Sequence, residues 1–393
     1  MLKKALKNNK KIYSLLVKKY ESFLVSVKRI KSIRHRLKPL DLKKIVFDNF
    51  SGKGYGGSPR FIAEEIIKQN KDYDLVWLVN DLNSSLPDGI RKVNANTDEA
   101  YYELSTARVW VDNVKDSNRP RKRKNQFYIQ TWHGGAGIKT AERDAEESLP
   151  YAYLRKSKRD SKEIDVFVAE TKMTYNSLQR TFWYSGDVIK ASFNRYNFDR
   201  ESIRHEVLRY FCVDEDIKIL LYVPTFRKDE RLDCYNIDFE RILNTLEDFY
   251  GGKWVAIIRL HPVIARYCHS IHYNSRVLDG TYYNSVEALI SSSDIVITDF
   301  SNCMFDGYRL KKKVFLYASD YEEYVSTDRK LYFDLESMPS PMCKNNDELI
   351  YAIENMDDRE YENKRKKLIE DIGYYEDDAA LICCDRIVNL LDE

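Results

Sequence analysis

Short apolar segments alternate with helix-like segments along most of this chain, and no other feature constrains the possible fold as strongly. Short buried strands between helices predict a parallel sheet with helices on both faces, the α/β class. The alternation begins near residue 43, breaks off near 190–215 and then starts again. The expected strands lie in residues 44–50, 74–81, 107–114, 126–132, 165–170, 217–224, 253–260, 295–298 and 313–318.

The restart of the pattern predicts two domains. A chain of 393 residues is too long for one ordinary hydrophobic core. We therefore expect two Rossmann-like, doubly wound α/β domains. The expected segments are an arm at 1–40, a first domain at 41–195, a second domain at 196–375 and a C-terminal helix at 376–393.

The first 38 residues carry a strong positive charge. They contain 13 lysines and arginines against one glutamate, although the whole chain has a net charge of only +2. Apolar residues at spacings of three and four accompany these cations, which is typical of an amphipathic helix that lies on an anionic membrane surface. Two alternatives stay open, namely a helix that packs on its own domain and an arm that binds nucleic acid.

The seven cysteines are scattered and form no Cys-x-x-Cys pair. This spacing predicts reduced thiols and argues against a disulfide framework or a zinc site. No apolar run approaches the 18 residues of a membrane-spanning helix, and the first residues lack the apolar core and cleavage site of a signal peptide. We therefore expect a cytoplasmic protein without an obligatory metal.

Polar residues gather where four of the expected strands end. Ligands of doubly wound sheets bind beyond the carboxyl ends of the strands, so these residues are candidates for a functional site. Arginine and helix N-termini bind anions, and a neutral histidine can accept a proton, so the set suits a phosphate group. We expect the two domains to bring their histidines to one cleft. The residues are His133, Gly134, Gly135, Lys139, Thr225, Arg227, His261, Asp299 and Ser301.

Each of these residues also has an ordinary structural interpretation. A histidine at a strand end is often only hydrogen-bonded, Ser301 can cap a helix, and Arg227 can pair with a surface acid. The two glycines after His133 we interpret as space for the close approach of a phosphate and an acceptor.

A glycine motif near the N-terminus supports a function of another class. Residues Gly52–Gly57 satisfy G-x-G-x-x-G between an expected strand and an expected helix, with Ser58 and Pro59 at the helix start. Asp81, after the next strand, lies about where a ribose-binding acid belongs. An NAD-dependent oxidoreductase is therefore the alternative, although it explains neither His261 nor Arg227.

With these residues in view, the chain resembles the CDP-glycerol glycerophosphotransferase family of teichoic-acid-type polymer synthesis. The resemblance runs from about residue 44 to 340. Its most specific block is SSSDIVITDFSNCMFDGYRLKKKVFLYASDYEEY, and three shorter motifs support it: WHGG with a following lysine, YVPTFR and RLHP. The chain departs from the family pattern at residues 135–138, at 192–197 and at Asn302.

The resemblance implies a GT-B-like pair of domains at the cytoplasmic face of the membrane, peripherally bound. It implies transfer of a polyol phosphate from CDP-glycerol, or alternatively CDP-ribitol, to a hydroxyl of a membrane-linked acceptor, with release of CMP. His133 resembles the catalytic base and His261 a second catalytic histidine. The substrate-binding set becomes Gly134, Gly135, Lys139, Thr225, Arg227, Asp299, Ser301, Asn302 and Asp306.

The expected partners follow from the same resemblance. They are the CDP-activated polyol, a lipid-linked glycan or polyol-phosphate acceptor and an anionic membrane surface, with no nucleic acid and with homo-oligomers as an option. No cofactor is expected to be obligatory. A divalent ion is compatible with the chemistry, but no cluster of acidic ligands in the sequence indicates one.

Overall fold

A computed structural model describes residues 19, 33–115, 119–196 and 199–393. The arm predicted for residues 1–40 lies almost entirely outside these residues. The rest of the chain forms two compact units, each with its own core. The first unit comprises the chain up to Gly135, Ala141–Asn194 and Tyr374–Glu393, and the second comprises Ala136–Thr140 and Arg195–Gly373.

The first unit is built on a sheet of seven parallel strands in the order β3-β2-β1-β4-β5-β6-β7. Its central strands are buried along most of their length because helices cover both faces. The strands are β1 (Asp41–Asp48), β2 (Asp74–Val79), β3 (Ile90–Asn94), β4 (Ala107–Asp112), β5 (Phe127–Gln130), β6 (Val166–Ala169) and β7 (Asp187–Lys190).

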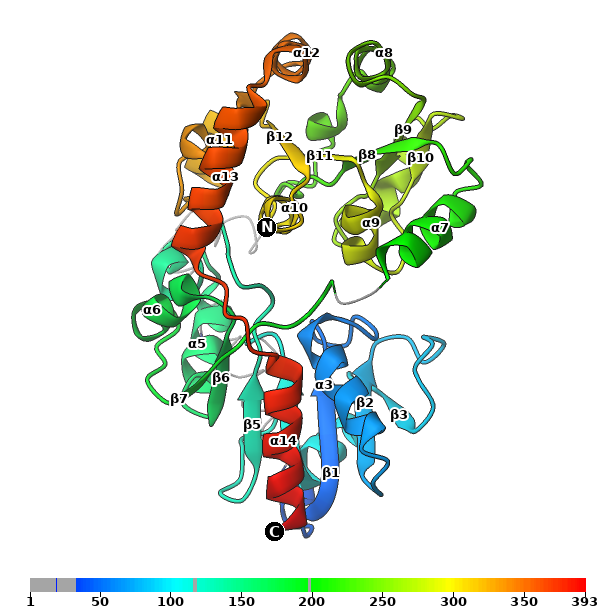
Figure 1. Ribbon diagram of the computed structural model, residues 1–393. Helices are drawn as coiled ribbons and strands as arrows, with labels where there is room; N and C mark the ends of the chain where they lie inside the picture. The colour runs from blue at the N-terminus through cyan, green and yellow to red at the C-terminus, as the bar shows by residue number, and fades with distance from the viewer. Residues whose placement is uncertain (1–18, 20–32, 116–118, 197–198) are drawn as a thin grey trace, which may run out of the picture. The chain divides into compact units, whose positions relative to one another are not determined.

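Two hydrophobic clusters lie on the two faces of this sheet. Helices α3 and α14, which lie side by side in Figure 1, contribute to one cluster, whereas α4 and α6 contribute to the other. Threonine side chains cap α4 and α6 at their N-termini. The helices of this unit are α3 (Gly57–Lys68), α4 (Asp98–Thr106), α5 (Tyr151–Asp160), α6 (Lys172–Thr181) and α14 (Ala379–Asp392).

The second unit repeats this architecture with six parallel strands in the order β10-β9-β8-β11-β12-β13. The strand order reverses between β8 and β11, which is where doubly wound sheets bind ligands. The strands are β8 (Lys218–Tyr222), β9 (Trp254–Ile258), β10 (Val277–Asp279), β11 (Ile295–Thr298), β12 (Lys313–Tyr317) and β13 (Met342–Cys343).

Helices cover the second sheet as well. The apolar side of α8 (Ile242, Leu243 and Leu246) packs with residues of α12 against one face. Contacts with β8, β11 and β12 come from α9 and α10. The helices are α7 (Arg200–Tyr210), α8 (Phe239–Tyr250), α9 (Val286–Ser292), α10 (Cys303–Arg309), α11 (Tyr321–Thr327), α12 (Asn346–Asn355) and α13 (Asp358–Ile372).

The chain returns to the first unit after α13. Gly373 ends that helix with a left-handed backbone (φ 64°), which glycine adopts without steric cost. Beyond it, Tyr374 bridges to Thr171, and the backbone N–H of Ala379 donates to the carbonyl of Ser192. The helix predicted at 376–393 therefore forms as α14 and belongs to the core of the first unit.

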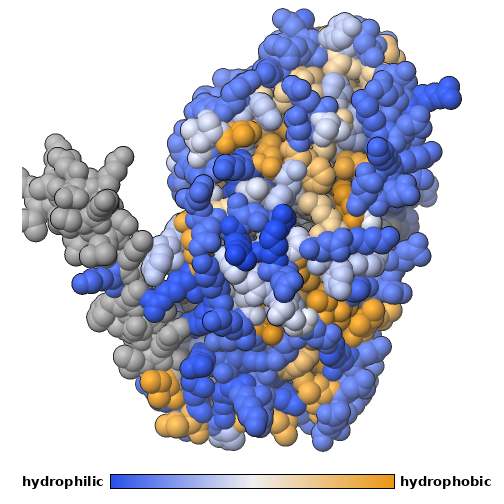
Figure 2. Space-filling model, turned by 90° about the vertical axis from the view of Figure 1, so that its left-hand side faces the viewer, coloured by the Kyte–Doolittle hydropathy of each residue, from blue (hydrophilic) through white to orange (hydrophobic). Residues whose placement is uncertain are grey.

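The predicted α/β class with two parallel sheets is confirmed. Among the described residues no helix is long and apolar enough to cross a membrane. On the face shown in Figure 2, hydrophilic residues predominate and the hydrophobic ones lie in several separate groups.

Candidate active site

His133 lies in the loop that follows β5, and its ring is held on several sides. Its Nδ1 lies 2.9 Å from the carbonyl oxygen of Asn113. The ring centroid is 4.0 Å from that of Trp132 and 5.2 Å from that of Phe50. Because a carbonyl can only accept, Nδ1 carries the proton, and in the neutral ring Nε2 holds the lone pair. This tautomer, inferred from the hydrogen bond, is the one a general base requires at Nε2.

His261 follows β9 and has the opposite tautomer. Its Nδ1 accepts the backbone N–H of Val263 at 3.2 Å, and its ring packs on Phe226 with the centroids 4.5 Å apart. An accepting Nδ1 is unprotonated, so the neutral ring carries its proton on Nε2. His261 can therefore donate a hydrogen bond to an anion, whereas His133 can accept a proton. Their placement relative to each other stays a prediction.

The loop after His133 leaves the first unit within a few residues. Ala136–Thr140 packs with the second unit, although the sequence placed it in the first domain. The backbone N–H of Ile138 donates to Asn302 Oδ1 at 3.1 Å, and Lys139 forms an antiparallel bridge with Leu331. The backbone N–H of Thr140 donates to the carbonyl of Lys330. These local pairings bring the predicted residues Lys139 and Asn302 into one neighbourhood.

Lys139 lies beside Thr225 in the second unit. Its Nζ is 3.4 Å from the Thr225 hydroxyl oxygen. Burial lowers the pKa of Lys139 to about 8; Asp299 opposes this shift, whereas the neighbouring Arg329 and Arg227 add to it. An anion that approaches Lys139 would stabilise the charged ammonium form, which its burial and the neighbouring cations disfavour.

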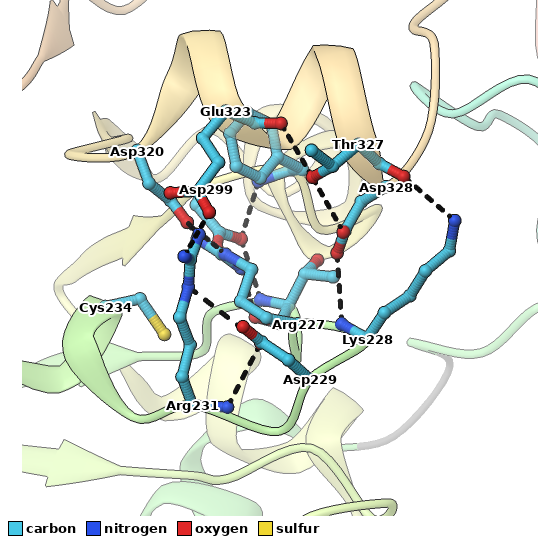
Figure 3. A network of polar contacts seen from close by, with 12 residues as sticks. Arg227, Lys228, Asp229, Arg231, Cys234, Asp299, Asp320, Glu323, Thr327 and Asp328 are labelled. Atoms are coloured by element: carbon cyan, nitrogen blue, oxygen red, sulfur yellow. Dashed lines mark hydrogen bonds and ion pairs between the residues drawn. The ribbon is translucent and has the colours of Figure 1, made fainter. Parts of the chain in front are cut away.

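Arg227 is almost fully buried between two carboxylates (Figure 3). Its Nη1 donates to Asp299 at 2.8 Å, and its Nε and Nη2 donate to Asp320 at 2.6 and 2.8 Å. The rings of Phe300 and Tyr324, stacked on each other with centroids 3.8 Å apart, lie on one side of the guanidinium, each centroid 5.1 Å away. We predicted Arg227 to contact the substrate; in the structure its bidentate fork is occupied by Asp320.

Asp299 and Ser301 organise the turn between β11 and α10. Asp299 Oδ1 accepts the backbone N–H groups of Thr225, at 2.7 Å, and of Phe300. The Ser301 hydroxyl accepts the backbone N–H of Cys303. Asp299 thereby joins the loops that follow β8 and β11. Both side chains hold the turn in shape, and a substrate contact for either stays a prediction.

Asp306 lies in α10 and is half-buried. Burial raises its pKa to about 6, and Glu287 raises it further, whereas Arg195 and Tyr196 lower it. The carboxyl of Asp306 therefore takes up a proton more readily than that of an exposed aspartate. The described residues contain no cluster of three or more His, Cys, Asp or Glu side chains that could hold a metal ion.

Different constraints require glycine at the two positions after His133. Gly134 has a positive φ of 142°, which side chains other than glycine rarely adopt. A Cβ on Gly135 would lie 2.9 Å from side-chain atoms of Thr171 and Tyr374. Packing inside the first unit therefore accounts for Gly135, which we had interpreted as clearing space for a ligand.

Packing accounts for the first and last glycines of the motif at residues 52–57, whereas Gly54 has open space around it and a φ of 90°. A Cβ on Gly52 would lie 2.8 Å from Asn80 Oδ1, and one on Gly57 would lie 2.5 Å from Asn49 Oδ1. Asp81, the expected ribose ligand, accepts the backbone N–H of Asn83 in its own turn. These contacts explain Gly52 and Gly57 without a dinucleotide.

Several important residues escaped the sequence analysis. Asp320 and Arg231 complete the network around Arg227, since Arg231 Nη2 donates to Asp320 at 2.8 Å. Asp320 follows β12, the strand next to β11, so its place at the same sheet edge was available as a signal. Asn113, which accepts from His133, follows β4 in the same way.

Comparison with known proteins identifies the family. The sequence family described as CDP-glycerol:poly(glycerophosphate) glycerophosphotransferase matches residues 30–392. A teichoic acid poly(glycerol phosphate) polymerase of Staphylococcus epidermidis is 29% identical over 340 residues, which cover 82% of this chain and 47% of that protein. A polymerase of the same name from Bacillus spizizenii is 28% identical over 359 residues, covering 86% of this chain and 90% of that protein.

A solved structure agrees in fold. The wall teichoic acid polymerase TagF has a TM-score of 0.80 to this chain at 24% identity, covering 96% of this chain and 97% of that one. The chain spans about half the length of the first relative and most of the second. The family predicted from the sequence is confirmed, and the chain belongs to the CDP-glycerol:poly(glycerophosphate) glycerophosphotransferase family.

Proposed function

We propose that this chain transfers glycerol phosphate from CDP-glycerol to a hydroxyl of a membrane-linked polyol-phosphate acceptor and releases CMP. The family match over residues 30–392 carries this assignment. Glycerol is favoured over ribitol because both relatives described above are poly(glycerol phosphate) polymerases. An oxidoreductase is disfavoured, since packing accounts for Gly52 and Gly57 and the Asp81 carboxylate accepts a backbone N–H of its own turn.

The proposed reaction is a direct displacement at the phosphorus that bears glycerol. The acceptor oxygen forms a bond to this phosphorus, and the bond from phosphorus to the bridging oxygen breaks, so that the bridging oxygen leaves with CMP. His133 takes the acceptor's proton at Nε2, the nitrogen left unprotonated by the bond to Asn113. Catalysis then depends mainly on positioning and charge neutralisation.

The donor-binding role belongs to residues of the second unit. Lys139 supplies positive charge next to the Thr225 hydroxyl, and His261 supplies an N–H donor at Nε2 for the phosphate that leaves with CMP. Arg227 acts indirectly, because its fork holds Asp320 and its Nη1 holds Asp299. The domain at 41–195, apart from residues 136–140, then serves the acceptor, and the domain at 196–375 together with those residues serves the donor.

Ligand-dependent unfolding tests the choice of donor. We expect CDP-glycerol to raise the melting temperature more than CDP-ribitol at equal concentration, and NADH to leave it unchanged. Ligand at about 100 times its Kd stabilises the folded state by about 2.7 kcal/mol, which is easily measured. Stabilisation by NADH without any effect of CDP-glycerol would support the oxidoreductase alternative instead.

Lys139→Gln tests the proposed phosphate contact. Wild-type affinity for CDP-glycerol should fall as the pH rises through about 8, because the ammonium form is lost above that pH. The variant should bind the donor at least about tenfold more weakly at pH 7, about 1.4 kcal/mol, and should lack this pH dependence. Lys330→Gln is the matched control, since it removes a charge at an exposed neighbouring position. Identical pH profiles for wild type and Lys139→Gln would refute the contact.

The two histidines should respond differently to amide substitution. An amide cannot accept the acceptor's proton, so His133→Gln should lower CMP release by about 10²–10⁴-fold while donor affinity stays within a few fold. Glutamine can still donate an N–H, so His261→Gln should keep considerably more activity than His261→Leu. Steady-state rates and donor affinities of the three variants show whether His133 acts as the base and whether His261 acts as an N–H donor. Activity of His133→Gln within tenfold of wild type would exclude the base.

The membrane partner is proposed from the basic arm. Deleting residues 1–38 removes 13 cations, so sedimentation with vesicles containing phosphatidylglycerol should fall sharply at moderate salt. Pure phosphatidylcholine vesicles are the control and should bind neither protein. Undiminished sedimentation of the truncated protein would show that the arm is not the anchor, and salt-sensitive binding of DNA without vesicle binding would favour the nucleic-acid alternative.

A further inference from the structure

Three residues near His133 have a backbone conformation that is unusual outside glycine. Phe50, Ser51 and Trp132 have φ values of 47°, 56° and 53°. Left-handed backbone at bulky residues persists only where the surrounding contacts enforce it, and it gathers at functional sites. Two of the three, Phe50 and Trp132, pack their rings on His133. Contacts within the first unit must therefore hold both the loop of Phe50 and the loop of Trp132 in this conformation.

Two buried asparagines hold the loop that contains Phe50, whereas the backbone N–H of Trp132 donates to Gln130 Oε1. Asn49 and Asn113 are 6% and 0% exposed and follow β1 and β4, the neighbouring strands at which the sheet order reverses. Asn113 Nδ2 donates to Asn49 Oδ1 at 2.7 Å. Asn113 Oδ1 accepts the backbone N–H of Phe50 at 2.9 Å. Asparagine suits this position because one side chain donates and accepts at the same time.

Asn113 affects the imidazole of His133 in two ways. Its side chain fixes the backbone of Phe50, whose ring packs on His133, and its own carbonyl accepts from His133 Nδ1. Asn49 supports this residue from the adjacent strand and also donates to the carbonyl of Gly54 at 3.1 Å. The amide pair also fills the space beside Gly57, where a Cβ would lie 2.5 Å from Asn49 Oδ1 and 2.7 Å from Asn113 Nδ2.

We propose that Asn113, supported by Asn49, is a positioning residue that fixes the tautomer and the ring plane of His133. The proposal rests on the proposed function, in which Nε2 of His133 is the base. Without the amide pair, the Asn113 carbonyl and the Phe50 ring lose their fixed positions. The imidazole then divides between its two tautomers, and the fraction with a proton on Nε2 cannot accept another. A base that is misplaced or wrongly protonated lowers the rate without weakening donor binding.

The test combines kinetics with nuclear magnetic resonance of the histidine rings. Protein with 15N-labelled histidine reports which ring nitrogen is protonated, and the signals of His133 among the six histidines are assigned by their absence in His133→Gln. In wild type we expect the proton on Nδ1. In Asn113→Ala we expect a mixture of tautomers and a kcat lowered at least about tenfold, with the KM for CDP-glycerol within twofold.

Two further variants make the result interpretable. Asn49→Ala removes the partner of Asn113 but leaves the bond to Phe50 available, so it tests the pair if Asn113→Ala does not fold; we expect the same changes, smaller in size. Asn80→Ala is the matched control, because Asn80 is exposed and holds the same loop through the carbonyl of Ser51. It should keep the wild-type tautomer and kcat.

The outcomes separate this inference from the proposed function. An unchanged His133 tautomer in both Asn113→Ala and Asn49→Ala overturns the positioning role, whether or not kcat falls. A mixture of tautomers with unchanged kcat also overturns it, because the ring state then has no consequence for the reaction. Failure of the base itself is detected independently, by full activity in His133→Gln.

Discussion

Parallel strand pairing decides where chemistry can gather in both units, because each strand delivers its last residues to the same edge of its sheet. In the second sheet, β11 pairs with β8 on one side and with β12 on the other. Thr225, Asp299 and Asp320 follow these three strands and are joined through Arg227. In the first sheet, Asn49 and Asn113 follow β1 and β4 and bond to each other, and the carbonyl of Asn113 accepts from His133 Nδ1.

Buried charge makes the loops of the second unit interdependent. Taking a guanidinium and two carboxylates out of water is costly, and good geometry with several hydrogen bonds is needed to offset that cost. Arg227 meets this condition through Asp299 and Asp320, and Asp320 also accepts from Arg231 (Figure 3). Removing one partner of such a set typically destabilises a protein by about 3–5 kcal/mol, because an uncompensated charge remains buried. The network thus favours one arrangement of these loops.

The sequence predicted the class of fold and the strands of both sheet centres, since a strand buried on both faces is apolar throughout. It missed the edge strands of both sheets, β3, β7, β10 and β13, which are short or carry several polar residues because an edge is partly solvated. The motif residues were found, but their partners depend on tertiary contacts. Nothing local to residues 136–140 predicts their pairing with residues 330–332, and nothing local to Arg227 predicts that Asp320 occupies its fork.

The two histidines show how partner identity, and not residue type, can set a chemical role. Both follow a strand of a parallel sheet and both use Nδ1 for a bond within their own unit. One Nδ1 faces a carbonyl and must donate, whereas the other faces a backbone N–H and must accept. A single reversed hydrogen bond therefore makes one Nε2 an acceptor and the other a donor. The proposed reaction needs a proton acceptor for the incoming hydroxyl and a donor to the departing phosphate, and the backbone around each ring leaves one Nε2 suited to each of these proposed tasks.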